Sequence, residues 1–260
     1  MFDVVCLGNA LVDVTVDVPD SFLLGAGLKK GSMSLTDDVS QKFLLSSING
    51  LSSLLSPGGS ASNVALGVAC LGGKSCFIGR VGVDVNGSFF ESSLVDRGVV
   101  VRLGKSVDLI TGSAISLITV GGERTFSTYL GAASSISKAD LVDVPESKFV
   151  HVEAYLLEDP KIKELIFDVV KKVKLAGSRV SFDLSDAELI KRIKPVIDEF
   201  LDLVDVVFAN EDEAKAFTGE DSFGAARVLS NLCDVAVVKL GGDGSLVVSN
   251  NVQEVISIEK

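Results

Sequence analysis

The sequence contains no tryptophan, two tyrosines, four cysteines and a single histidine, His151. Zinc sites built on several histidines are therefore excluded, and the strand-like run around His151 favours a buried structural role for this side chain. The cysteines form no C-x-x-C pair and have apolar neighbours, which indicates small core residues. A chain of this length without a disulfide pattern suits a reducing compartment, so we predict a cytoplasmic location.

Basic side chains are also scarce, since 24 lysines and arginines stand against 35 aspartates and glutamates, for a net charge of −11. An acidic surface repels nucleic-acid phosphates and anionic membranes. Residues 43–73 carry no charge and are long enough to span a bilayer, but Pro57-Gly58-Gly59 interrupts them. We therefore expect a small-molecule partner, and neither a nucleic acid nor a membrane.

Apolar strands alternate with helices along most of the chain, which favours a mostly parallel sheet covered by helices on both faces. The expected strands are residues 4–7, 75–78, 99–102, 149–153, 179–184, 204–209 and 235–239, and the expected helices are 38–55, 60–71, 84–97, 160–175, 186–201 and 211–231, the last broken near Gly219. The fold class is thus a three-layer α/β/α domain.

Two segments do not fit this core, because polar and apolar residues alternate in them as in half-exposed strands. They are residues 11–37 and 110–131, and we predict that they form a small β-sheet lid on a single unit that covers residues 1–260. Residues 253–258 also have the pattern of a strand. No helix follows them, so an apolar edge or face of the main sheet is expected to stay uncovered.

The strongest local motif is Pro57-Gly58-Gly59-Ser60-Ala61-Ser62-Asn63. Two glycines at the start of a helix let a ligand approach the backbone, and the first helical N–H groups then face it as donors. Asn63 lies one turn into the helix and can both donate and accept hydrogen bonds. The arrangement suits vicinal hydroxyls or a phosphate, although a tight turn followed by close helix packing explains the glycines equally well.

Two segments with carboxylate side chains follow apolar strands, at the edge where parallel sheets collect ligands. Asp13 could accept two hydrogen bonds from a diol, or could be a solvated loop carboxylate. Asn210 and Glu213 open the helix that follows residues 204–209. They could serve a magnesium ion, which favours a few oxygen ligands, or could simply complement the helix dipole.

Few segments of the sequence have the basic side chains or the glycine-rich backbone of a phosphate-binding site. Residues 239–245, Lys-Leu-Gly-Gly-Asp-Gly-Ser, form a glycine-rich turn after a buried strand. This turn could approach a nucleotide, but it is not a P-loop, and a plain hairpin explains it as well. Arg80 and Arg124 could bind phosphate or be structural cations.

Together and in this order, the motifs resemble the PfkB carbohydrate kinase family, whose fold is ribokinase-like. Gly58 to Asp84 is similar to the family's N-terminal signature, and Gly8 to Asp13 to its opening strand and substrate aspartate. Asn210-x-x-Glu213 matches the motif linked to magnesium and phosphate. Residues 30–33 and 123–132 resemble the adenosine-kinase-like branch.

The resemblance implies ATP and Mg²⁺ as cofactors and transfer of the ATP γ-phosphoryl group to a primary hydroxyl, here the 5′-hydroxyl of a nucleoside such as adenosine. The residues implied are Asp13, Met33, Gly58, Gly59, Asn63 and Arg124 for the substrate, Lys239, Gly241 and Gly244 for the nucleotide, and Asn210 and Glu213 for magnesium. A ribokinase-like or fructokinase-like sugar kinase is the alternative within the family.

One family element is missing, namely the Gly-Ala-Gly-Asp segment that carries the catalytic base. Gly25-Ala-Gly27 is followed by Leu28, and Asp243 lies in the upstream turn, so neither replaces it. We expect the 260-residue chain, apparently truncated at its C-terminus, to be nearly inactive alone. An inactive nucleoside-binding remnant is therefore a further alternative. A monomer and a lid-mediated homodimer are both compatible with the sequence.

Overall fold

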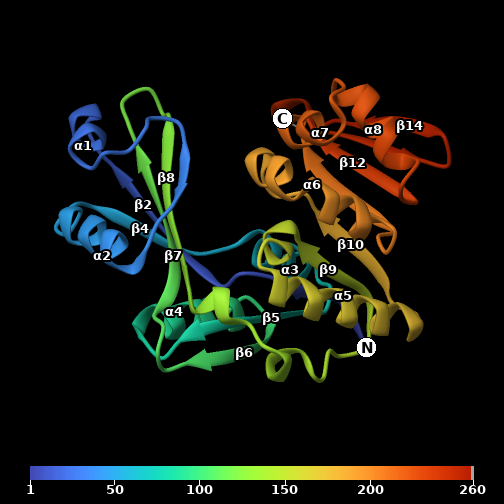
Figure 1. The fold of residues 1–260 in the computed structure, drawn as a ribbon, viewed down its shortest axis with the longest axis horizontal. Helices are drawn as coiled ribbons and strands as arrows, with labels where there is room; N and C mark the ends of the chain where they lie inside the picture. The colour runs from blue at the N-terminus through green and yellow to red at the C-terminus, as the bar shows by residue number, and fades with distance from the viewer. Residues whose placement is uncertain (259–260) are drawn as a thin grey trace.

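A computed structural model describes residues 1–258 and contains two β-sheets (Figure 1). The larger sheet has nine strands in the order β14-β13-β12-β11-β10-β9-β1-β5-β6. They are β1 (Phe2–Leu7), β5 (Ser75–Gly82), β6 (Val100–Ser106), β9 (Ser147–Glu153), β10 (Arg179–Asp183), β11 (Val206–Asn210), β12 (Val235–Lys239), β13 (Ser245–Ser249) and β14 (Val252–Ile256). Neighbours from β6 to β12 are parallel, and β13 and β14 add an antiparallel edge. The predicted, mostly parallel sheet is confirmed.

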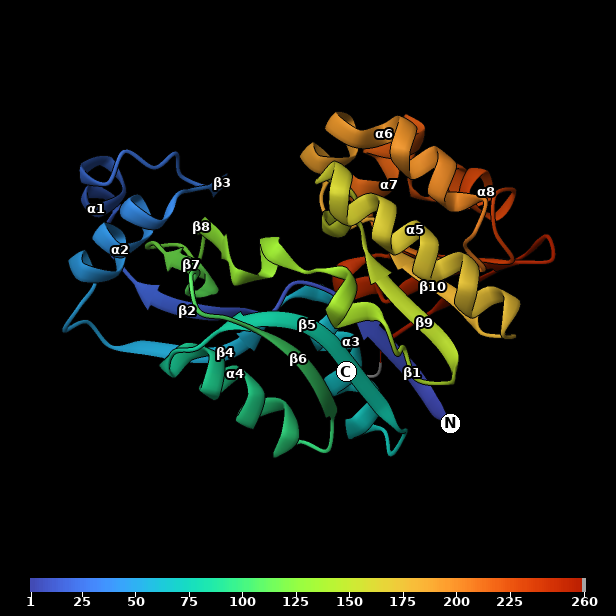
Figure 2. The same cartoon turned by 60° about the horizontal axis from the view of Figure 1, so that its bottom comes forward.

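Helices cover the two faces of this sheet unequally. They are α3 (Ser60–Cys70), α4 (Val85–Val95), α5 (Pro160–Leu175), α6 (Ala187–Leu201), α7 (Glu211–Thr218) and α8 (Ser222–Ser230). One buried cluster joins α5 to α8 to one face, and a second joins α3 and α4 to the β1, β5 and β6 part of the opposite face. Figure 2 shows α5, α6, α7 and α8 together on one side of the strands.

The lid is a second sheet of five strands in the order β3-β8-β7-β2-β4. Its elements are β2 (Leu11–Asp17), α1 (Asp20–Gly25), β3 (Met33–Leu35), α2 (Asp38–Ser47), β4 (Ser53–Gly58), β7 (Thr111–Ile118) and β8 (Arg124–Gly131). The hairpin of β7 and β8 occurs where the alternating pattern placed it. The lid rises from one end of the larger sheet (Figure 1).

The helix expected over residues 38–55 is wrong in its second half. It ends at Ser47, and Gly50 adopts φ +89°, a conformation that suits glycine and breaks the helix. Residues 53–58 then form β4, which pairs antiparallel with β2 from Val16–Ser53 to Leu11–Gly58. A third chain segment, outside 11–37 and 110–131, therefore belongs to the lid sheet.

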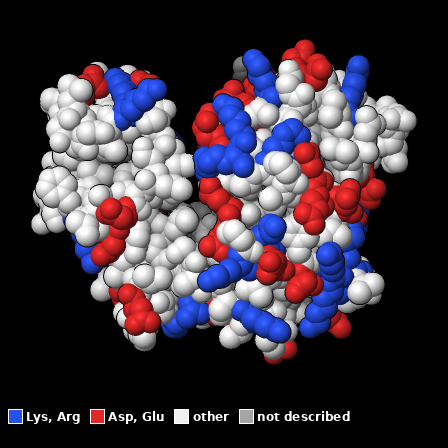
Figure 3. Space-filling model, viewed as in Figure 1, with Lys and Arg blue, Asp and Glu red and all other residues white. Residues whose placement is uncertain are grey.

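The surface also divides into two regions. Charged side chains crowd the α/β core, while the lid is largely uncharged in the view of Figure 3, and a hollow separates the two.

The strand expected near residues 253–258 is β14, the edge strand of the larger sheet at the end away from β6, where Val255 and Ile256 are about half exposed. Within residues 1–258, no helix combines the length and apolarity that a membrane span requires.

Candidate active site

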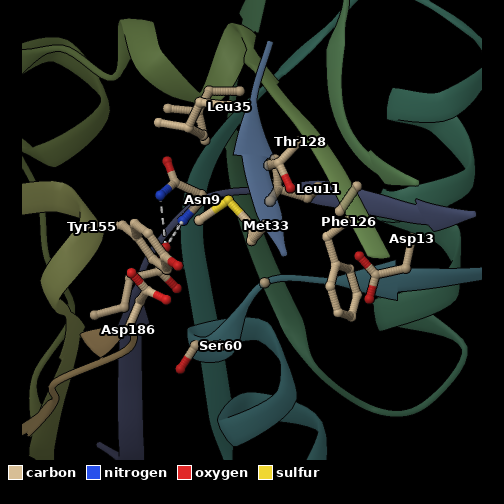
Figure 4. Close-up of a pocket in the computed structure, with 14 residues that line it drawn as sticks. Asn9, Leu11, Asp13, Met33, Leu35, Ser60, Phe126, Thr128, Tyr155 and Asp186 are labelled. Atoms are coloured by element: carbon tan, nitrogen blue, oxygen red, sulfur yellow. Dashed lines mark hydrogen bonds between the residues drawn. The ribbon is translucent and has the colours of Figure 1, made fainter. Parts of the chain in front are cut away.

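A cavity of about 320 Å³ opens between the lid and the carboxyl ends of the central strands (Figure 4). The lid lines it with Leu11, Asp13, Met33, Leu35, Ala114, Phe126, Thr128 and Leu130, and the core with Asn9, Gly59, Ser60, Glu153, Tyr155 and Asp186. Of the predicted substrate residues, the cavity therefore brings together Asp13, Met33 and Gly59. Gly58 lies directly behind Asp13.

Asp13 is the carboxylate of the lid side of the cavity. It lies on β2 opposite Ser56 of β4, and its side chain lies against Gly58, where an added Cβ would approach its Oδ1 to 2.0 Å. Glycine is thus required there for the carboxylate to occupy its place. Within residues 1–258 the Asp13 side chain accepts no hydrogen bond, and burial raises its pKa to about 6. Its oxygens are free for hydroxyl donors of a ligand.

Gly59 connects β4 of the lid to α3 of the core. Its φ of +96° lies in the region that favours glycine, and an added Cβ would stand 2.3 Å from the Asn9 carbonyl oxygen. The glycine therefore lets two backbone segments meet at the cavity wall, as well as leaving room for a ligand. Ser60, the next residue, donates its hydroxyl to Asp183 at 2.7 Å.

Apolar and aromatic side chains form much of the remaining wall. Met33 and Leu35 come from β3, and Phe126 from the neighbouring β8, with which β3 pairs in parallel. Tyr155 faces them from the core, in the short η3 helix (Ala154–Leu157). Only Met33 was predicted from the sequence, because alternation alone does not show which face of a lid strand meets the core.

Glu153 is a site residue that the sequence reasoning missed. It ends β9 with 1% of its surface exposed, and its carboxylate accepts hydrogen bonds from both nitrogens of Asn9 and from the Ala61 N–H. Burial raises the pKa of Glu153 to about 7, although the three hydrogen bonds oppose this shift. Its sequence signal is the same as that of Asp13, a carboxylate at the carboxyl end of an apolar strand, where parallel sheets collect ligands.

Two predicted substrate residues lie outside the cavity wall. Asn63 is exposed on the first turn of α3, and Arg124 is exposed where β8 begins after the hairpin turn. Their proposed contacts with a substrate stay predictions. Arg80 has a structural partner, because its guanidinium pairs with the mostly buried Asp140 at 2.8 Å.

Asn210 and Glu213, the predicted magnesium residues, bind each other. The Glu213 carboxylate accepts from the Asn210 backbone and side-chain nitrogens at 2.7 and 2.6 Å, and the Asn210 amide oxygen accepts from the Glu213 N–H at 2.8 Å. Burial raises the pKa of Glu213 to about 7. Because this capping box engages these oxygens, the pair fits a metal held through water better than direct coordination. Residues 1–258 contain no cluster of three acidic, cysteine or histidine side chains placed for a metal.

The predicted nucleotide residues lie around the β12–β13 turn. Lys239 ends β12, and its ammonium is 3.7 Å from the Asp183 carboxylate. Gly241 is exposed and has open space around it, whereas a Cβ on Gly244 would stand 2.0 Å from the Ile256 carbonyl. Gly244 is therefore needed for the turn itself, and Gly241 and Lys239 are the members of the set that a ligand could approach.

His151 lies on β9, in the wall of a groove that side chains of α3 also line. It is 1% exposed, its Nδ1 lies 3.0 Å from the Ser181 hydroxyl, and burial lowers its pKa to about 4. The burial expected from the strand-like sequence is confirmed, but the histidine is not fully satisfied, because its Nε2 is buried without a hydrogen-bond partner among residues 1–258. It lines an apolar groove with Phe149, Val206 and Phe208.

Comparison with known proteins places this architecture in a family. The model of the pfkB family of carbohydrate kinases matches residues 40–260. Aminoimidazole riboside kinase of Salmonella typhimurium is 31% identical over 203 residues, which are 74% of this chain and 63% of that protein. A fructokinase of Vibrio alginolyticus is 29% identical over 210 residues, 77% of this chain and 68% of that protein.

Solved structures give the same result over a longer stretch. Adenosine kinase from Sinorhizobium meliloti is 31% identical, with a TM-score of 0.88 over 100% of this chain and 80% of that one. The matched stretch spans 63% of the aminoimidazole riboside kinase and 68% of the Vibrio fructokinase, so this chain covers only part of the length of these curated relatives. The ribokinase-like fold expected from the sequence is confirmed, and the chain belongs to the pfkB family of carbohydrate kinases.

Proposed function

We propose that the protein is a nucleoside kinase that transfers the γ-phosphoryl group of ATP to the 5′-hydroxyl of a ribonucleoside, with adenosine as the leading candidate. Membership in the pfkB family supports phosphoryl transfer to a hydroxyl group. Similarity to aminoimidazole riboside kinase and to adenosine kinases supports a ribose-containing substrate with an attached base.

The observation that carries this proposal is the two-sided chemistry of the cavity. Asp13 offers an unpaired carboxylate, which suits the vicinal hydroxyls of a ribose. Met33, Leu35, Phe126 and Tyr155 offer an apolar and aromatic wall, which suits a flat base. A free sugar carries hydroxyls around its whole ring, and some of them would face this wall without hydrogen-bond partners, at a cost in affinity.

The chain's own residues would act mainly by positioning. Asp13 would fix the ribose, Gly59 would let it approach the backbone, and the lid would exclude water from the base. Bound ATP with Mg²⁺ would supply the phosphoryl group. Lys239 stands at the strand end where its charge could meet phosphate, and Asn210 and Glu213 could orient water around the metal.

A hexose is the second candidate substrate, because several curated relatives of similar identity are fructokinases. We also propose a cytoplasmic location. For the oligomeric state, the two proposals are a monomer and a homodimer paired through the lid.

Radiolabelled ATP tests the reaction directly. The protein would be incubated at enzyme excess with Mg²⁺ and, separately, adenosine, inosine, ribose or fructose, and the labelled product quantified over time. We expect adenosine to be labelled fastest. Faster labelling of fructose than of either nucleoside would contradict the nucleoside assignment. Saturable adenosine binding with no labelled product from any substrate would instead establish the binding-only remnant.

A further inference from the structure

The lid and the core are joined by chain crossings, and two of these crossings meet at one side chain. The first crossing runs from β1 to β2 through Asn9, and the second runs from β4 to α3 through Gly59 and on to Ala61. Glu153, at the end of β9, reaches both of them. Its Oε1 accepts the Asn9 N–H and the Asn9 side-chain amide, each at 2.8 Å, and its Oε2 accepts the Ala61 N–H at 3.0 Å.

The packing around Glu153 leaves little room for another arrangement. A Cβ on Gly8 would stand 2.4 Å from Ala61 Cβ and 2.7 Å from Glu153 Oε2. A Cβ on Gly59 would stand 2.3 Å from the Asn9 carbonyl oxygen. The two crossings therefore lie against each other, and Glu153 supplies the acceptor for their inward-facing N–H groups. Buried donors that lose their acceptor are costly, so this carboxylate constrains both crossings at once.

A third crossing, from β6 to β7, is held in a similar way by a different carboxylate. Asp84 accepts the Thr111 N–H at 2.7 Å, the Thr111 hydroxyl at 2.7 Å and the Gly87 N–H at 2.8 Å. The crossing is thereby tied to the first turn of α4. Of these two carboxylates, Glu153 joins two crossings and lines the cavity, whereas Asp84 joins one crossing to α4 and is absent from the cavity wall.

We propose that Glu153 is a positioning residue that clamps the lid to the core through both crossings and so sets the geometry of the cavity. Asp13 lies four residues beyond Asn9 on β2, and Gly59 lies two residues before Ala61, so the clamp spaces the two substrate contacts. The three hydrogen bonds that the carboxylate accepts come from Asn9 and Ala61, and the clamp acts on the cavity through these two residues. The proposal rests on the proposed function only for its effect on nucleoside binding.

Glu153→Gln is the sharpest test, because the amide keeps one acceptor oxygen but presents a donor where the second oxygen was. The Asn9 hydrogen bonds can persist, whereas the Ala61 N–H would face another donor. Hydrogen–deuterium exchange of the unliganded protein at pH 8, read by mass spectrometry, should show about tenfold faster exchange or more in peptides covering residues 59–66 and in lid strand β4. Peptides from β10 to β12 should change little.

Asp205→Asn is the matched control. Asp205 also accepts a backbone N–H, that of Val180 at 2.6 Å, and a lysine, but it lies in the core away from the lid. Its replacement should speed exchange around Val180 and leave residues 59–66 unchanged. Asn9→Ala, which deletes one of the three hydrogen bonds, gives a milder clamp variant if Glu153→Gln does not fold, and should accelerate exchange less, at the same crossing.

Unchanged exchange at residues 59–66 in a folded clamp variant would overturn the proposal. So would acceleration spread evenly over lid and core, because that is the result of a general loss of stability. Calorimetric titration with adenosine adds a second arm, in which Glu153→Gln should weaken binding about tenfold more than Asp205→Asn does. If wild-type protein binds no nucleoside, the proposed function fails, and the exchange result still decides the clamp.

Discussion

Asp13 combines an open hydrogen-bonding capacity with a pKa that burial raises to about 6. The carboxylate form accepts hydroxyl hydrogen bonds, and protonation removes part of this capacity. We therefore expect nucleoside affinity to increase about tenfold as pH rises from 5 to 7, and to level off above that. Calorimetry at four pH values measures it.

The matched variants for this prediction are Asp13→Asn and Asp17→Asn. Asp17 lies on the same strand but is exposed at its far end, so its replacement should leave the pH profile intact. Asp13→Asn should weaken binding and flatten the profile. A profile that keeps its slope in Asp13→Asn would assign the pH dependence to another group.

Gly59 carries a conformational requirement that can be separated from its contacts. We expect Gly59→Ala to lower the free energy of unfolding by about 1–3 kcal/mol and to impair nucleoside binding, because the methyl group meets the Asn9 backbone. Gly177→Ala is the control, since Gly177 has a similar φ of +95° but no atom within 4 Å of an added Cβ. Urea unfolding of both variants measures the difference. Equal losses would mean that φ alone, and not the close approach, makes Gly59 necessary.

At the level of single residues, Asp13, Gly59 and Met33 were predicted because each belongs to a short segment that resembles the family, and all three line the cavity, while their contacts with a substrate stay predictions. Phe126 and Tyr155 escaped prediction for a physical reason. Phe126 lines the cavity because of the face that its lid strand turns toward the core, and Tyr155 because the turn after β9 lies across the cavity from the lid. Both placements depend on contacts between segments that are distant in the sequence. Motif spacing carries no information about such contacts.

Elements that bury a continuous apolar stripe were predicted well. Helices α5 and α6 and strands β9 to β12 lie within a few residues of their expected ranges, because local periodicity and tertiary burial agree there. Strand β4 was missed, since Leu51-Ser-Ser-Leu-Leu55 is compatible with a helix. Only pairing with β2, a tertiary contact, makes this stretch a strand.

Strand β8 presents its two faces to different surroundings, which allows a test of the apolar wall. Phe126 lines the cavity, whereas Tyr129, three residues on, does not. Phe126→Ala should weaken adenosine binding about 10- to 100-fold, because an aromatic contact with the base is lost, while any ribose binding changes little. Tyr129→Ala should leave both affinities nearly unchanged. Equal weakening of ribose and adenosine by Phe126→Ala would show that the wall contacts no base.

For the whole molecule, the two most perturbed acidic groups predict how stability depends on pH. Burial raises the pKa values of Glu153 and Glu213 to about 7, above those of the unfolded chain. The folded state therefore retains protons that the unfolded state loses. The free energy of unfolding should fall as pH rises from 5 to 8, by up to about 1.4 kcal/mol per pH unit for each group. Asp13, whose pKa is also raised, adds to this fall, whereas His151, whose pKa burial lowers to about 4, opposes it below about pH 6.5.

Urea unfolding at pH 5, 6, 7 and 8 tests this slope. Glu213→Gln removes one group and should flatten the curve by about half of these two groups' contribution. A wild-type stability that increases across the whole range would contradict the raised pKa values of Glu153 and Glu213, because the opposing contribution of His151 ends near pH 6.5.

The central claim is that the cavity binds a sugar that carries a base. Calorimetric titration of the wild-type protein with adenosine and with fructose at pH 8, where Asp13 is ionised, tests it most directly. We predict that adenosine binds at least about tenfold more tightly than fructose. Tighter binding of fructose, or equal binding of the two, would contradict the account.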